Sequence, residues 1–276
     1  MRVTNLNRTQ TLSFRMNGAT VTARFPDAGL AERLGGVYPC VRADTEDGRD
    51  PDIVVRRTAR GYELSRARVT EACRSIGELL PVFEWTLTLA LLERVSGCVH
   101  LHASGVVAHG RALLALGATG GGKSTLAMHW SRRGAAVLGD DTVLLDAGGR
   151  AHAFRRLFKL DPGAVTRAGI PLGSTPWWEP GSDEAWYDPE AGGGWADPAP
   201  VAVVALVARA GGASERMAPL ARAAGLAALL QSCQSTGRTG AEAMDVVSRV
   251  AATARIVTCT YQESDTAAAT LLELLA

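Results

Sequence analysis

Alternation of hydrophobic and polar residues dominates the first part of the chain and predicts β-strands. Residues 10–25 alternate on both sides of Asn17-Gly18, a dipeptide typical of two-residue hairpin turns. A second pair of strands is predicted at 52–56 and 62–65, around a turn at Arg60-Gly61. The first part of the chain is therefore expected to contain two β-hairpins.

A helical pattern follows the hairpins. From Glu71 to Val95, apolar residues recur at three- and four-residue spacing, and Pro81 either kinks this helix or begins a second one. The charged stretch 42–51 is expected to be a loop. We therefore expect residues 1–96 to form a small α+β domain, in which no pattern suggests a catalytic site.

The remainder of the chain mixes apolar runs with helical patterns, which predicts an α/β domain over residues 97–276. Expected strands cover 99–108, 111–116, 200–208 and 256–261, with two short strands within 135–146. Expected helices cover 123–133, 217–230, 241–254 and 266–275. The first of these helices directly follows a glycine-rich loop.

That loop reads Gly117-Ala118-Thr119-Gly120-Gly121-Gly122-Lys123-Ser124-Thr125 and matches the phosphate-binding pattern G-x-x-x-x-G-K-[ST]. Glycines let backbone N–H groups converge on phosphate oxygens, and the following helix directs the positive end of its dipole at the anion. Lys123 is expected to bind the β- and γ-phosphates, and the Ser124 hydroxyl to ligate Mg²⁺. A plain glycine-rich turn is the alternative, but the predicted strand and helix on either side favour nucleotide binding.

Lysine is rare in this chain, so its positions are informative. Of the 29 basic residues, only Lys123 and Lys159 are lysines. Lysine offers a compact point charge where arginine offers a planar fork, so Lys159 is a second candidate phosphate contact. Arg155, Arg156 and Lys159 either bind the transferring phosphate or an acceptor carboxylate, or are solvated charges on an edge strand.

Two adjacent carboxylates, Asp140 and Asp141, lie between two short apolar runs, 16 residues after Ser124. The segment reads as a bend between two strands, unlike the single long strand of an ordinary Walker B motif. A Mg²⁺ ion at a P-loop needs a nearby carboxylate, which favours a functional pair over a surface turn. His102 lies on the strand that precedes the P-loop strand, where a functional and a structural role are both open.

Three of these segments together resemble the HPr kinase/phosphorylase superfamily: His102-Ala103-Ser104, the P-loop, and Arg133 to Asp141. The chain is most similar to the stand-alone branch linked to lasso-peptide gene clusters, whose members phosphorylate the C-terminal serine of a precursor peptide. The resemblance covers residues 98–160 well and the rest loosely. It implies a P-loop kinase core of the type found in HPr kinase and phosphoenolpyruvate carboxykinase.

The resemblance also implies roles for individual residues. Asp140 would be the general base on the acceptor hydroxyl, and His102 would orient the acidic pair. Asp141 would join Ser124 around Mg²⁺, while Lys123 would bind the β- and γ-phosphates of ATP. The expected partner is a peptide or protein substrate bearing a serine, and the superfamily implies a homo-oligomer.

The chain departs from the family pattern in three ways. The loop reads Gly117-Ala118-Thr119, without the Asp-Ser that bacterial HPr kinases place after the first glycine, and the N-terminal domain is short and unlike theirs. The longer signature segment of the regulatory enzymes is not found either. These differences weigh against HPr as the substrate and against a phosphorylase activity. The alternatives are a nucleotide-dependent ATPase or switch, for which no arginine finger is evident, and a kinase of HPr or of a small-molecule hydroxyl.

Residues 173–198, the tryptophan-rich segment, hold four of the six tryptophans among prolines, glycines and acidic residues. A loop of this length is either functional or disordered, and clustered tryptophans argue against disorder. We expect a lid or a peptide-binding surface, or else a loop that docks on the core or on another subunit.

Composition excludes several classes of protein. A net charge of +1 gives no reason to expect a nucleic-acid partner, and no apolar run approaches the roughly 18 residues of a membrane-spanning helix. The start, Met1 to Asn5, lacks the apolar core of a secretion signal. The cysteines form no C-x-x-C pair and are expected to be the reduced thiols of a cytoplasmic protein. They are Cys40, Cys73, Cys98, Cys233 and Cys259.

Overall fold

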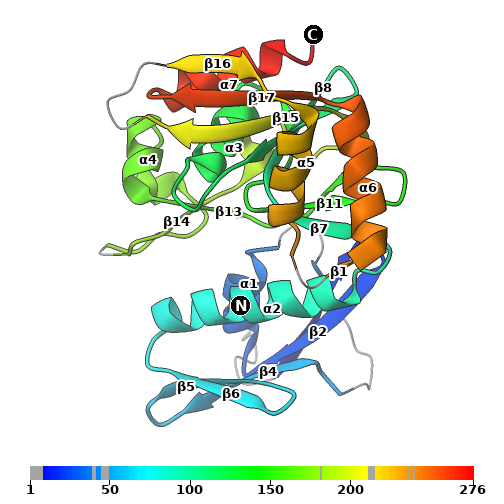
Figure 1. The fold of residues 1–276 in the computed structure, drawn as a ribbon. Coiled ribbons are helices and arrows are strands. Elements are labelled where there is room, and N and C mark those ends of the chain that lie inside the picture. Colours follow the sequence, from blue (N-terminus) through cyan, green and yellow to red (C-terminus); the bar gives the residue numbers. More distant parts are fainter. Residues whose placement is uncertain are drawn as a thin grey trace. The chain divides into compact units, whose positions relative to one another are not determined.

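The computed structural model contains two compact units, residues 1–96 and 97–276, and confirms the mixed α/β class (Figure 1). It describes residues 9–38, the backbone of 42–44, and residues 50–180, 182–210, 215–234, 237–238 and 240–276. The expectations for Met1 to Asn5 and for Cys40 lie outside the described residues.

In the described residues, the smaller unit is built on a six-stranded sheet of order β3-β1-β2-β4-β5-β6. Its strands are β1 (Gln10–Met16), β2 (Ala19–Phe25), β3 (Arg42–Asp44), β4 (Ile53–Thr58), β5 (Gly61–Arg66) and β6 (Val69–Cys73). Both predicted hairpins, β1–β2 and β4–β5, are confirmed. Asn17 and Gly18 have φ angles of 46° and 81°, as the tight turn between β1 and β2 requires.

Two strands lie where none was predicted. β3 falls within the expected loop at 42–51. β6 includes Glu71 to Cys73, which were predicted to begin the helix. β6 pairs with β5 through a turn in which Ala67 has a φ of 51°. Pairing at the sheet edge therefore overrides the weak helical periodicity of these residues. The helix begins only after Ser75, whose hydroxyl accepts a hydrogen bond from the Glu78 N–H (3.1 Å).

Two helices of this unit, α1 (Ala28–Gly35) and α2 (Ile76–Arg94), pack on the sheet. α2 is one continuous helix, although Pro81 lies inside it. Phe83 on α2 meets the rings of Phe14 and Phe25 on the sheet, with centroids 6.1 and 5.4 Å apart. All three rings are fully buried and form the centre of this unit's core.

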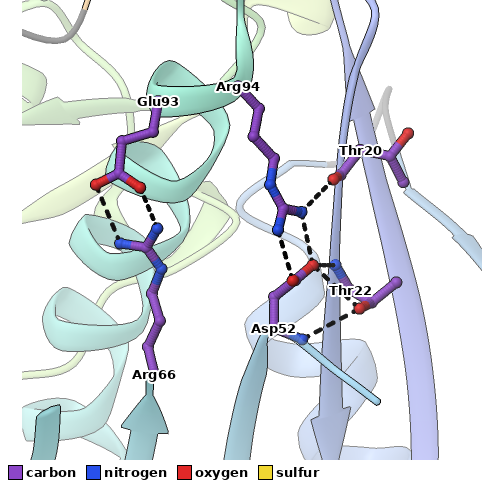
Figure 2. Close-up of polar contacts among 6 residues, drawn as sticks. All are labelled: Thr20, Thr22, Asp52, Arg66, Glu93 and Arg94. Carbon is purple, nitrogen blue, oxygen red and sulfur yellow. Dashed lines mark hydrogen bonds and ion pairs between the residues drawn. The ribbon is translucent and has the colours of Figure 1, made fainter. Parts of the chain in front are cut away.

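The end of α2 is tied to the sheet by charged pairs (Figure 2). Arg94 donates to both carboxylate oxygens of Asp52, at 2.6 and 2.7 Å, and Asp52 also accepts from the Thr22 N–H at 2.8 Å. Arg66 and Glu93 form a second pair beside it. Although burial opposes ionisation, the hydrogen bonds from Arg94 and Thr22 hold the pKa of Asp52 below its ordinary value.

The larger unit is built on a mixed sheet that has nine strands in the described residues. These are β7 (Val99–His102), β8 (Ser104–Ala108), β9 (Arg111–Leu116), β10 (Ala136–Gly139), β11 (Thr142–Leu145), β12 (Arg150–Ala153), β15 (Ala199–Arg209), β16 (Arg216–Pro219) and β17 (Arg255–Tyr261). β9, β15 and β17 are parallel neighbours, so their carboxyl ends share one edge. β10 runs in the direction of β9, because β8 is antiparallel to both.

Helices cover both faces of this sheet (Figure 1). They are α3 (Lys123–Arg132), α4 (Pro162–Arg167), α5 (Arg222–Gln231), α6 (Gly240–Thr253) and α7 (Ser264–Glu273). Leu113 and Ala115 of β9 pack in one cluster with residues of α3 and α7, whereas Ala112 and Leu114 pack in another with residues of α5 and α6. Alternate residues of a central strand thus face opposite helical layers, as in an α/β sandwich.

The structure corrects two predicted elements of this unit. The expected strand 99–108 is divided at Ala103 into β7, which pairs with β11, and β8, which pairs with β9 and β10. The expected helix 217–230 begins only at Arg222, because residues 216–219 pair with β17 as β16. The other predicted helices and strands are confirmed to within two residues at most ends.

The tryptophan-rich segment packs on the core of the larger unit along part of its length. Two short strands, β13 (Phe158–Leu160) and β14 (Ala185–Tyr187), pair with each other, and Trp186 in β14 is 1% exposed. Trp195 meets the ring of Phe158 edge-on, with centroids 5.8 Å apart. Trp177 and Trp178 stay partly exposed, so docking accounts for only part of the segment. Two 3₁₀ turns complete it, at Leu172–Ser174 and Pro189–Ala191.

Two further features of the described residues concern their cysteines and the lengths of their helices. The described cysteines, Cys73, Cys98, Cys233 and Cys259, are all free thiols. No helix within the described ranges has the length and apolar character needed to cross a membrane.

Candidate functional site

The P-loop connects the end of β9 with the start of α3, as predicted. Two of its glycines leave no room for a side chain. A Cβ at Gly117 would lie 2.5 Å from the Val207 carbonyl oxygen, and one at Gly122 would lie 2.1 Å from the Tyr261 hydroxyl. Gly122 is the N-cap of α3, and no described side chain caps the helix there. The first N–H groups of α3 therefore remain available to an anion.

Lys123 folds back over the loop. Its side chain is 5% exposed, and its ammonium group donates hydrogen bonds to the carbonyl oxygens of Gly117 (2.8 Å) and Ala118 (3.2 Å). Burial lowers the pKa of Lys123, while the nearby Asp141 and Asp140 oppose that shift. The ammonium is thus held by groups that a phosphate oxygen can replace.

The acidic pair occupies the bend between β10 and β11, at the sheet edge where the P-loop begins. His102 pairs in register with Thr142, and its Nδ1 lies 2.9 Å from an Asp141 carboxylate oxygen. Burial opposes ionisation of Asp141, but the His102 hydrogen bond and the charges of Arg156 and Lys123 hold its pKa below its ordinary value. Asp141 is therefore ionised at neutral pH.

Asp140 has different surroundings. It is 3% exposed, and it forms a buried ion pair with Arg156 at 3.1 Å. Burial raises the pKa of Asp140, and the charge of Arg156 opposes this. The hydroxyls of Ser104 and Ser124 both donate to the Asp140 backbone carbonyl, the second at 3.4 Å. The P-loop serine is thus joined directly to the acidic bend.

A pocket in the larger unit brings these groups together. It is lined by His102, Thr119, Gly120, Gly122, Lys123, Ser124, Thr125, Asp141, Lys159, Leu160, Asp161, Ala164, Arg167 and Arg209. Four cationic side chains face two carboxylates among these residues. Such a positive balance beside open helix N–H groups suits an anionic ligand such as a polyphosphate.

Most of the residues predicted for the site line this pocket, and five do not. Gly117 and Gly121 belong to the loop without facing the pocket, and Asp140 and Arg156 are paired with each other outside its lining. Arg155 is half-buried and also does not line it. Lys159 does line the pocket, and its ammonium lies 3.8 Å from Glu184 and 5.8 Å from the centre of the Trp186 ring.

Sequence reasoning missed several residues of the site. Arg167 reaches the pocket from α4, Asp161 from the N-cap of α4, and Arg209 from the end of β15. Arg209 ends the strand beside the P-loop strand and so lies at the same edge, but that strand order cannot be read from a local sequence pattern. No local motif marks Arg167 or Asp161.

Among the described residues, no group of three or more His, Cys, Asp and Glu side chains lies close enough to hold a metal ion. Mg²⁺ beside a bound nucleotide commonly has only one or two protein ligands and takes the others from phosphate and water. Ser124 and Asp141, which line the same pocket, fit that requirement.

Comparison with models of known protein families and with curated proteins finds no match to this chain.

Proposed function

We propose that this protein is an ATP-dependent kinase with an HPr kinase-like core, which transfers the γ-phosphoryl group to a serine hydroxyl. The C-terminal serine of a lasso-peptide precursor is the first candidate acceptor. One observation carries the proposal: the P-loop, its Lys123 and the His102–Asp141 pair face a single pocket. Phosphoryl transfer needs this combination of positioning, charge neutralisation and a nearby carboxylate.

The nucleotide phosphates are bound by the P-loop backbone and Lys123. The uncapped start of α3 supplies N–H donors, and Lys123 exchanges its carbonyl partners for phosphate oxygens. Ser124 and Asp141 would hold Mg²⁺, which neutralises charge on the phosphates when it is bound. Arg167, Arg209 and Lys159 add positive charge on the other walls of the pocket.

The acidic pair handles the acceptor proton. The serine oxygen attacks the γ-phosphorus, the bond to the β–γ bridging oxygen breaks, and ADP leaves with that oxygen. The serine proton passes to a carboxylate of the pair. The family resemblance gives this role to Asp140, whose buried position makes it the stronger base. Asp140 must then gain access to the acceptor, because of the two adjacent carboxylates only Asp141 lines the pocket in this structure.

Mass spectrometry of a precursor peptide ending in serine, incubated with the protein, ATP and Mg²⁺, tests the proposal. Phosphate on the terminal serine is expected. Asp140→Asn should slow transfer about 100- to 10,000-fold while largely sparing ATP binding, as expected for loss of a general base. Asp141→Asn should weaken binding of Mg²⁺ with ATP. Asp146→Asn, a carboxylate on a turn outside the pocket, is the matched control and should leave transfer unchanged.

Two outcomes would change the assignment. If Asp141→Asn abolishes transfer with ATP and Mg²⁺ binding intact, while Asp140→Asn stays active, the base is Asp141. If free phosphate is released and the peptide stays unmodified, the protein is an ATPase or acts on another acceptor, and the peptide-kinase proposal is wrong.

A further inference from the structure

Tyr261 contacts the P-loop, although 140 residues separate it from Gly121 in the chain. It ends β17, the strand beyond β15 in the sheet, and its ring is 2% exposed. Its hydroxyl donates a hydrogen bond to the Gly121 carbonyl oxygen at 3.0 Å. A side chain from β17, the last strand in chain order, thus contacts the backbone of the phosphate-binding loop.

The fit between this hydroxyl and the loop is close. A Cβ on Gly122 would lie 2.1 Å from the Tyr261 oxygen, so only glycine fits beside it. Gly122 also has a φ of +88°, which other residues rarely adopt. Tyr261 and Gly122 therefore form one packed unit, in which the hydroxyl occupies the space that a side chain would need.

The hydrogen bond fixes the orientation of one peptide plane. In a trans peptide the C=O and the following N–H point in opposite directions. Because Tyr261 holds the Gly121 carbonyl on one side, the Gly122 N–H points to the other side. Gly122 lines the pocket and is the N-cap of α3, where backbone N–H groups meet an anion.

We infer that Tyr261 is a positioning residue for the phosphate-binding loop, holding the Gly121–Gly122 peptide so that its N–H points at the nucleotide phosphates. This inference rests on the nucleotide binding in the proposed function, but not on the identity of the acceptor. Burial raises the pKa of Tyr261 to about 12, so its hydroxyl remains a donor throughout the physiological range.

Tyr261→Phe tests the inference, because it removes the hydroxyl and keeps the ring and its packing. We expect the dissociation constant for a non-hydrolysable ATP analogue with Mg²⁺, measured by calorimetry, to rise about 3- to 10-fold, as for one lost hydrogen bond. The KM for ATP should rise in parallel, while the KM for the acceptor peptide stays unchanged. A purely structural role would lower the melting temperature without this selective effect.

Tyr38→Phe is the matched control. Tyr38 is a fully buried tyrosine of the smaller unit, and its hydroxyl is hydrogen-bonded to Thr88 at 2.6 Å. The variant should lower the melting temperature and leave the dissociation constant for the ATP analogue as in the wild type.

Gly122→Ala provides a second variant that keeps the inference falsifiable. Its Cβ meets the Tyr261 hydroxyl, so its effect on the dissociation constant should be smaller in a Tyr261→Phe background than in the wild type. Equal ATP affinity in wild type and Tyr261→Phe would overturn the inference and leave the kinase proposal standing. Normal nucleotide binding without peptide phosphorylation would overturn the peptide-kinase proposal and leave the inference about Tyr261 standing. A wild-type protein that binds no nucleotide would overturn both.

Discussion

Asp140 and Asp141 are neighbours in the chain but differ in charge behaviour. The Asp141 carboxylate accepts a hydrogen bond from His102 and has a lowered pKa, whereas burial raises the pKa of Asp140 in spite of Arg156. One carboxylate is therefore suited to hold a cation and the other to accept a proton. Their separation comes from the sharp bend after β10, which sends the two side chains into different surroundings.

Asp52 in the smaller unit gives a prediction about stability and pH. Its pKa lies below the ordinary 3.8, so its ionised form contributes stability above that pH and the contribution is lost as pH falls through the folded-state pKa. Asp52→Asn should lower the free energy of unfolding at pH 7 by about 1–2 kcal/mol, a value reduced for the partial exposure of the Arg94 pair.

Urea unfolding at pH 7 and pH 3 measures this effect. The difference between wild type and variant should shrink at the lower pH, and a difference that is the same at both would contradict the assigned role of the charge. The exposed Asp50, two residues away, supplies the control: Asp50→Asn should change stability little at either pH.

At the scale of elements, the tryptophan-rich segment combines a docked part and an exposed part. β14 places Trp186 in the core beside β13, and Lys159 of β13 lines the pocket at the P-loop. Deleting residues 177–195 would remove buried side chains as well as exposed ones, so a loss of activity would not show whether the exposed part contacts a peptide. Single substitutions distinguish the docked part from the exposed part.

Trp186→Ala should affect stability, whereas Trp177→Ala should affect binding of the acceptor peptide. Removing the fully buried Trp186 should lower the free energy of unfolding by about 3–5 kcal/mol. Trp177→Ala should leave the melting temperature nearly unchanged and raise the KM for the acceptor peptide, because its side chain is partly exposed. Steady-state kinetics and thermal unfolding measure both, and an unchanged KM in Trp177→Ala would remove the peptide-binding hypothesis for this segment.

At the scale of the whole molecule, the residues proposed to bind the nucleotide all lie in the larger unit, whereas the smaller unit has its own aromatic core. Ligands that bind only the folded state stabilise the unit that holds them. The two units should therefore respond differently to nucleotide.

ATP with Mg²⁺ should raise the unfolding temperature of the larger unit and leave that of the smaller one unchanged. At a nucleotide concentration 100 times the dissociation constant, the gain is about 2.7 kcal/mol. Calorimetry, with the fluorescence of Trp85 as the tryptophan reporter of the smaller unit, would follow both transitions. Lys123→Ala should abolish the shift, and a shift confined to the smaller unit would contradict the proposed site.

The fold could be predicted from the sequence where local patterns were strong. The Asn17-Gly18 hairpin, the strand entering the P-loop, α3 and the bend at Asp140 all follow from turn chemistry and apolar spacing over a few residues. The break at Ala103 and the strand β6 could not be predicted, because the alternation of residues 99–108 continues through the break and the edge pairing of β6 is not local.

The sequence by itself determined that a glycine-rich loop with the P-loop pattern stands between a strand and a helix and that two carboxylates follow at short range, since these features depend on neighbouring residues. The tertiary structure alone decided that Arg156 pairs with Asp140, that Arg209 reaches the pocket, and that Tyr261 donates to the Gly121 carbonyl oxygen. Arg209 and Tyr261 reach the P-loop because β9, β15 and β17 lie parallel and end at one edge. Strand order, which no local pattern encodes, therefore decides which distant side chains complete the site.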